Sequence, residues 1–172
     1  MAPVQFTVAG ALVESGAGLL LVCNRRRNGL TDWSTPGGVI DATDPSLLDG
    51  LTREVAEETG LVVTAWEGPL YEVRAIAVDM GWSLRCEVHR ALGFEGDLTV
   101  DDPDGIVIDA RFAHPEECSV ILASCAPWVG EPIADWLTHR WGPSDAREYV
   151  YEVSGSDRRE LRATRVAQES GA

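Results

Sequence analysis

The sequence predicts an α/β domain in which a mixed β-sheet lies between helices, an α/β/α sandwich of three layers. Strand-like runs stand on both sides of one amphipathic helix, a pattern that favours a sheet covered by helices. The length of 172 residues suits a single domain with a substantial core. A hydrophobic content of 45% and a charged content of 24% are ordinary for a globular chain.

The N-terminal third begins with two expected strands, Val4–Val13 and Gly18–Cys23, joined by a turn over Glu14–Gly18. A polar loop, Asn24–Gly29, follows them. Proline and two consecutive glycines then occur in Trp33–Gly38, and this composition predicts a tight loop rather than the interior of an element.

The central helix is expected over Asp44–Thr59. Asp44 can cap it, Pro45 fits its first position, and Gly60 stands where a C′ glycine belongs. An apolar stripe recurs at helical spacing and gives the helix a buried face: Leu47, Leu48, Leu51 and Val55.

The elements after Gly60 are expected strands and then two helices. The expected strands are Leu61–Thr64, Leu70–Val78, Ser83–Phe94 and Ile106–Phe112, and the expected helices are His114–Ala123 and Pro132–Arg140. We divide the chain into a main domain over residues 1–142 and a C-terminal extension over 143–172. In the extension, Glu148–Val153 and Arg158–Val166 are expected to form a hairpin or a frayed tail.

Composition restricts the function classes. The net charge is −14, and all 14 basic residues are arginines, without a basic stripe, so we expect no nucleic-acid duplex as a partner. No apolar run is long enough for a membrane span. With no secretory signal and no CxxC pair among the four cysteines, we expect reduced thiols and a cytoplasmic location.

Three glutamates on the central helix are the main candidates for chemistry. Glu54, Glu57 and Glu58 stand at i, i+3 and i+4, which places them on one flank. Charged helix residues are usually only a solvated face. Here, however, like charges repel one another and lie near the helix C-terminus, where the macrodipole disfavours anions. A divalent cation would resolve this conflict, because carboxylate oxygens suit Mg²⁺ and Mn²⁺.

The segment around these glutamates resembles the Nudix box. Gly38, Asp44 and the run Arg-Glu-Val-Ala-Glu-Glu-Thr-Gly-Leu over Arg53–Leu61 follow the pattern G-x5-E-x7-R-E-U-x-E-E-x-G-U, where U is aliphatic. Two departures occur: Asp44 replaces a glutamate, and one extra residue separates it from Arg53. Both fall before the intact run, so they concern the loop more than the chemistry. The resemblance implies a Nudix-type three-layer fold.

The resemblance also implies roles for individual residues. Glu54, Glu57 and Glu58, with the carbonyl of Gly37, would bind Mg²⁺, for which Mn²⁺ can substitute. Glu54 or Glu57 would act as the general base; a later loop offers the alternatives Asp101, Asp102 and Asp104, which equally suit a plain turn. Arg53 would hold a carboxylate in place.

Substrate contacts are expected from the loops beside the box. One of Arg25, Arg26 and Arg27, with Arg27 preferred, would bind phosphate through its guanidinium. Gly38 would contact the substrate through its backbone. Trp33 could stack on a base, although packing under the loop is the favoured interpretation.

The implied activity is Mg²⁺-dependent hydrolysis of a nucleoside diphosphate linked to a group X, by water attack on phosphorus. An oxidised nucleoside triphosphate is the leading substrate, and ADP-ribose or a nucleotide sugar is the alternative. A non-catalytic nucleotide-sensing module is the competing class, but it would normally have lost part of the glutamate set. Isoprenoid diphosphate isomerisation would need a loop cysteine, whereas Cys23 lies in an apolar strand. A homodimer remains an open alternative.

Overall fold

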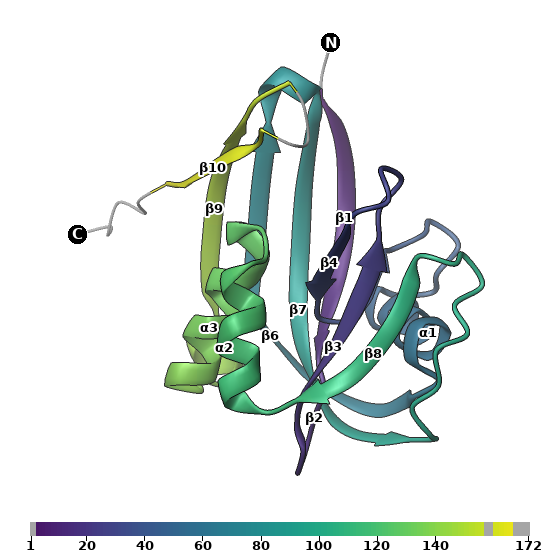
Figure 1. Ribbon diagram of the computed structural model, residues 1–172. Coiled ribbons are helices and arrows are strands. Elements are labelled where there is room, and N and C mark those ends of the chain that lie inside the picture. The colour runs from purple at the N-terminus through teal and green to yellow at the C-terminus, as the bar shows by residue number, and fades with distance from the viewer. Residues whose placement is uncertain (1–2, 157–159, 167–172) are drawn as a thin grey trace.

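The computed structural model describes residues 3–156 and 160–166. It is an α/β structure in which a mixed sheet has helices packed around it, as predicted (Figure 1). Helix α1 (Leu47–Thr59) lies on one side, whereas α2 (Pro115–Ala123) and α3 (Pro127–His139) lie on the other.

The larger sheet has six strands in the order β10-β9-β6-β7-β1-β5. Their bounds are β1 Val4–Leu12, β5 Gly37–Val39, β6 Val62–Ala77, β7 Trp82–Glu95, β9 Arg147–Ser154 and β10 Arg162–Arg165. The pairs β1–β7 and β6–β9 are parallel and the other pairs are antiparallel, so the sheet is mixed. The expected strands Leu61–Thr64 and Leu70–Val78 form one strand, β6, whose register shifts between Glu67 and Tyr71.

The smaller sheet is built on β3 (Gly18–Arg25). It pairs antiparallel with β2 (Glu14–Ser15), β4 (Thr31–Ser34) and β8 (Val107–Ala113). The prediction of a plain loop over Trp33–Gly38 was therefore wrong in part. Trp33 and Ser34 end β4, and the two glycines belong to β5, which is a short edge strand beside β1.

Alternation of side chains along β1 creates two separate cores. Ala9 and Ala11 pack with Leu51 of α1, whereas Leu12 belongs to the cluster that contains Trp136 of α3. Successive strand residues point to opposite faces, so an uninterrupted apolar strand indicates a sheet buried on both sides. The three layers follow from this pattern.

The N-terminus of α1 differs from the prediction. The helix begins at Leu47, and Ser46, not Asp44, is its N-cap, accepting a hydrogen bond from the backbone N–H of Asp49 at 3.1 Å. Asp44 is unsuited to the cap because its carboxylate is bound elsewhere, to Arg53. The C-terminus agrees with the prediction: Gly60 adopts φ 74°, a left-handed conformation that glycine tolerates best.

Helix α3 begins earlier than expected. Helix α3 starts with Pro127 in its first turn and carries Pro132 inside it, so the expected start at Pro132 was wrong. Proline is common in the first helical turn, and for this reason the sequence predicts a helix start at Pro132. A buried proline inside a helix is nevertheless tolerated when packing stabilises the helix. Helix α2 matches its prediction to within one residue.

The C-terminal segment includes a hairpin. Strands β9 and β10 pair antiparallel, and β9 adds to the edge of β6 in parallel. Tyr149 and Tyr151 of β9 are fully buried, and their hydroxyls donate to Asp135 and Glu131 of α3 at 2.9 and 2.8 Å. The frayed end expected over 168–172 lies outside the described residues.

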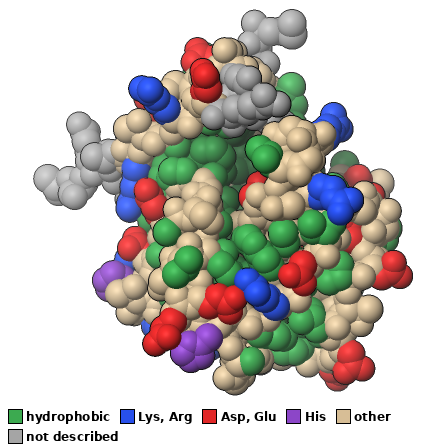
Figure 2. Space-filling model, in the orientation of Figure 1, with side chains coloured by type: hydrophobic (Ala, Val, Ile, Leu, Met, Phe, Trp, Pro, Cys, Tyr) green, Lys and Arg blue, Asp and Glu red, His purple; other side chains and the backbone are tan. Residues whose placement is uncertain are grey.

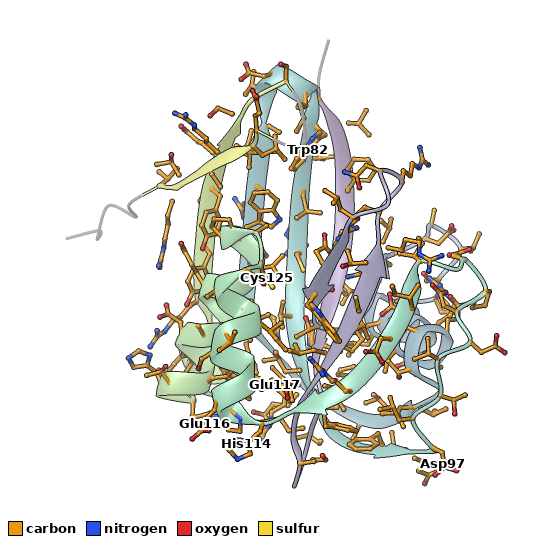
Figure 3. The ribbon with its side chains drawn as sticks, in the orientation of Figure 1. Trp82, Asp97, His114, Glu116, Glu117 and Cys125 are labelled. Carbon is orange, nitrogen blue, oxygen red and sulfur yellow. The ribbon has the colours of Figure 1, made fainter. Side chains whose placement is uncertain are left out.

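Two further features are the state of the cysteines and the length of the helices. All four cysteines are free thiols. Figure 3 labels Cys125, which lies between α2 and α3 and whose thiol donates to the carbonyl of Trp33 at 3.0 Å. Across the described residues, no helix has the length and apolar character needed to cross a membrane.

Candidate active site

The three glutamates share one flank of α1, as their spacing predicts, but they differ in exposure. Glu58 is 9% exposed and lies among buried groups, whereas the side chain of Glu57 is 36% exposed. Glu58 therefore reaches the interior where α1 meets the larger sheet.

Glu58 is hydrogen-bonded to the backbone of strand β5. The backbone N–H of Gly37 donates to Oε2 of Glu58 at 3.0 Å. Burial raises the pKa of Glu58 to about 8, although the Gly37 hydrogen bond opposes the shift; nearby Glu54 and Asp102 add to it. Its surroundings therefore disfavour the ionised form of this carboxyl group.

Glu54 lies against Gly38, the second glycine of strand β5. A Cβ on Gly38 would stand only 2.6 Å from Oε2 of Glu54, so a side chain at this position would displace the carboxylate. Burial raises the pKa of Glu54, and the charges of Glu57 and Asp104 act in the same direction, whereas Arg53 lowers it. Gly38 thus helps to set the position of Glu54.

Arg53 organises the acidic side chains. Its Nε and Nη2 donate to the two carboxylate oxygens of Asp44 at 3.0 and 2.9 Å, a bidentate pair. Its Nη1 donates to Glu54 at 2.8 Å and to Glu57 at 3.3 Å. Planar guanidinium suits such a fork, so one arginine positions three carboxylates.

The loop between β7 and β8 passes the C-terminal end of α1, where the backbone N–H of Thr99 donates to the carbonyl of Thr59 at 2.8 Å. Within this loop, Asp102 accepts backbone hydrogen bonds from Asp104, Ile106 and Val107 at 3.2, 2.9 and 2.8 Å. Asp102 therefore shapes the loop. Asp104 is the loop aspartate whose charge raises the pKa of Glu54.

The three consecutive arginines have different surroundings. Arg26 forms a bidentate pair with Asp32 at 2.6 and 2.7 Å. Arg27 lies exposed in the turn between β3 and β4, and the backbone N–H of Arg25 donates to the carbonyl of Ile106 at 2.7 Å. Within the described part of the chain, neither Arg25 nor Arg27 forms an ion pair.

Trp33 packs rather than standing free. It contacts the core cluster that includes Trp136, and the guanidinium of Arg111 lies 4.7 Å from its ring centroid.

Sequence reasoning missed Asn24, a buried amide whose Nδ2 donates to Asp32 at 3.2 Å and to Ser34 at 2.9 Å. An asparagine ending an apolar strand was the signal for a polar contact there.

The donor chemistry fits a hard divalent cation, although the side chains do not enclose one. Among residues 3–156 and 160–166, no three carboxylate, imidazole or thiol groups converge on one point. Arg53 engages one oxygen each of Glu54 and Glu57, and Gly37 engages one of Glu58. In the same ranges no hydrogen bond reaches the second oxygen of any of the three, so each retains a free donor atom.

Other acidic groups lie away from this cluster. Figure 3 shows His114, Glu116 and Glu117 together at one end of α2, on the opposite side of the sheet from α1. On the face drawn in Figure 2, hydrophobic side chains fill the central hollow and charged side chains lie mostly around it. The acidic cluster of α1 is therefore separate from the acidic residues of α2.

Comparison with known proteins identifies the fold. The family described as NUDIX domain matches residues 4–137. No curated protein matches the chain. Among solved structures, a MutT protein from Bacillus halodurans is similar with 21% identity, covering 92% of this chain and 97% of that one, at a TM-score of 0.63.

Two further structures agree. A MutT NUDIX hydrolase from Burkholderia pseudomallei has 23% identity and covers 71% of this chain and 87% of that one, with a TM-score of 0.56. A MutT protein from Methanosarcina mazei Go1 has 19% identity and covers 81% and 99%, with a TM-score of 0.63. These likenesses show the fold, while the family match spans most of the sequence and includes Arg53–Leu61. The chain therefore belongs to the NUDIX domain family, as the box predicts.

Proposed function

We propose that the chain is a Mg²⁺-dependent hydrolase that cleaves the diphosphate bond of a nucleoside diphosphate linked to a group X. The observation that carries the proposal is the crowding of Glu58, buried and with its pKa raised to about 8, beside Glu54 and Glu57. In its fully ionised form such a cluster is costly unless a cation neutralises it.

The proposed metal-binding groups are Glu54, Glu57, Glu58 and the carbonyl of Gly37. Bound Mg²⁺ would neutralise the charge of the diphosphate and orient the leaving group. Mn²⁺ would serve in its place. The side chains of Glu54 and Glu57 each offer the oxygen that Arg53 does not engage.

Glu54 is the proposed general base, with Glu57 as the second choice. A carboxylate accepts a proton from water more readily when its pKa is raised towards neutrality, and burial raises the pKa of Glu54. Among the loop alternatives, Asp104 is favoured over Asp102, since the carboxylate of Asp102 is occupied by three backbone N–H groups. Arg53 holds Glu54 in position and does not act on the substrate.

Arg27 remains the proposed phosphate contact, with Arg25 as the second candidate. Both guanidinium groups lack an ion-pair partner among the described residues, and the backbone of Arg25 lies beside the Asp102–Ile106 loop. Gly38 would let the substrate approach its backbone. The cytoplasm is the proposed location, which agrees with four free thiols. A homodimer stays a prediction.

A screen of the purified protein tests this function. The substrates are nucleoside triphosphates with normal and oxidised bases, ADP-ribose, and nucleotide sugars, each with Mg²⁺, with Mn²⁺ and with EDTA. We expect metal-dependent release of a nucleoside monophosphate and a phosphorylated X from one class, and the class hydrolysed fastest identifies X. Nucleotide binding without hydrolysis in any metal would overturn the proposal in favour of a sensing module.

A further inference from the structure

Gly50 occupies an interior position of α1, where glycine is unfavourable. It is buried in the first half of the 13-residue helix, and no residue type except proline disfavours a helix interior more strongly. The backbone conformation of Gly50 does not require glycine, since its φ is not positive. The reason for the glycine must lie in what surrounds it.

The neighbour of Gly50 is the carboxylate of Asp44. A Cβ built on Gly50 would stand 2.7 Å from Oδ2 and 3.0 Å from Cγ of Asp44, and 3.0 Å from Cδ1 of Ile40. The contact of 2.7 Å is shorter than real Cβ atoms make, and the two contacts of 3.0 Å are tight, so a methyl group would push the carboxylate away. The missing side chain leaves the space that Asp44 occupies.

Asp44 is held at this place from two other directions. Its Oδ2 accepts a hydrogen bond from the backbone N–H of Asp41 at 2.8 Å, and both its oxygens accept from Arg53. The side chain is only 8% exposed. A carboxylate fixed by a loop N–H on one side and a guanidinium on the other has little freedom to yield to a methyl group.

The two departures from the Nudix box meet at this contact. Aspartate is one methylene shorter than the usual glutamate, and one extra residue separates it from Arg53. The shorter side chain reaches Arg53 with its carboxylate lying directly against the surface of α1, at Gly50. The glycine therefore compensates for the aspartate.

We propose that Gly50 is a positioning residue: by leaving room for Asp44 to form its fork with Arg53, it fixes the guanidinium that holds Glu54 and Glu57. This inference rests on the proposed function for the importance of those carboxylates. The coupling of Gly50 to Asp44 depends only on the contact between these two residues.

A double-mutant cycle with Gly50→Ala and Asp44→Ala tests the inference. In the wild-type background we expect Gly50→Ala to weaken Mn²⁺ binding about tenfold, the scale of effects from residues that orient metal ligands. In the Asp44→Ala background the same change should alter the Mn²⁺ dissociation constant less than about twofold, because the carboxylate to be displaced is absent. An equal effect in both backgrounds would overturn the inference.

Two readouts do not depend on metal or activity. Alanine is the better helix former, so Gly50→Ala should raise the folding equilibrium constant about fivefold in the Asp44→Ala background and give no such gain with Asp44 present. The Nε–H proton of Arg53, which donates to Asp44, should exchange with solvent faster in Gly50→Ala than in the wild type. The inference fails if alanine stabilises both backgrounds equally and leaves that exchange rate unchanged. If the wild type binds no Mn²⁺, the proposed function fails, and these two readouts still decide the role of Gly50.

Discussion

The backbone N–H of Gly37 donates to Oε2 of Glu58 across 3.0 Å, joining strand β5 to the last turn of α1. This contact places the backbone of β5 against Glu58, the most buried of the three glutamates. It is the one hydrogen bond of Glu58 within the described residues, so the carboxyl group is oriented while burial disfavours its ionised form.

The first prediction concerns pH and Glu58 in the metal-free protein. Its pKa is about 8 in the folded chain against an ordinary 4.5. Between these values the unfolded state releases a proton that the folded state keeps, so the free energy of unfolding falls as pH rises, by an amount on the order of 4 kcal/mol. Urea unfolding from pH 5 to pH 8 measures this. The fall should be much smaller in Glu58→Gln, and equal slopes would contradict the assignment.

The second prediction concerns Arg53. Arg53→Lys removes the planar fork that binds Asp44 and Glu54, so we expect the rate of hydrolysis to fall about 10- to 100-fold. Because the arginine side chain is 37% exposed, stability should change by less than about 1 kcal/mol. Arg74→Lys, which alters a surface arginine of β6 paired with Glu72, is the control. Similar activity losses in both variants would refute a specific role.

The third prediction concerns Gly37. Its φ of 144° is rarely accessible to other residues, and a Cβ would collide with the carbonyl oxygen of Ala9. Gly37→Ala should therefore lower the free energy of unfolding by more than about 2 kcal/mol. Gly16→Ala, with no atom within 4 Å of the added Cβ, should cost less than about 1 kcal/mol. Comparable losses at both positions in chemical denaturation would be evidence against this constraint.

The fourth prediction concerns the C-terminal hairpin. The hydroxyl of Tyr151 donates to Glu131 at 2.8 Å, and its ring is fully buried. Tyr151→Phe should lower the free energy of unfolding by about 1.5–3 kcal/mol, since a hydrogen bond to a charged group is lost. Arg162→Ala, at an exposed position of β10, is the matched control with little effect.

Removal of the chain after Gly142 extends this test. It deletes β9 and uncovers the core that Tyr149 and Tyr151 fill, so we expect the cooperative unfolding transition to disappear. A truncated chain that still unfolds cooperatively would show that the main domain does not need the hairpin.

The central helix and the shared flank of its three glutamates could be predicted from the sequence because they depend on local spacing. Glu54, Glu57 and Glu58 at i, i+3 and i+4, and Gly60 at the C-terminus, need only helical geometry to be placed. The prediction of Asp44 as the N-cap was wrong, since Ser46 caps the helix. Asp44 and Ser46 both suit an N-cap, and only the position of Arg53 decides between them.

Features that depend on distant contacts could not be predicted. The two glycines of β5 form a strand only because β1 lies beside them, and Pro132 is accommodated because α3 packs against the core. The burial of Glu58 depends on α1, the glycine loop and the β7–β8 loop together. Spacing within a helix carries no information about such an environment, so the raised pKa is a property of the folded structure.

The rate of diphosphate hydrolysis in Glu57→Gln and Glu58→Gln tests the central claim most directly. Each variant is compared with the wild type on the substrate that the screen selects, with saturating Mg²⁺, and folding is checked by thermal unfolding. Glu116→Gln, at the start of α2, is the matched control. We predict a fall of at least about 100-fold in both variants and none in the control. Folded Glu57→Gln and Glu58→Gln proteins that hydrolyse the substrate as fast as the wild type would contradict the account.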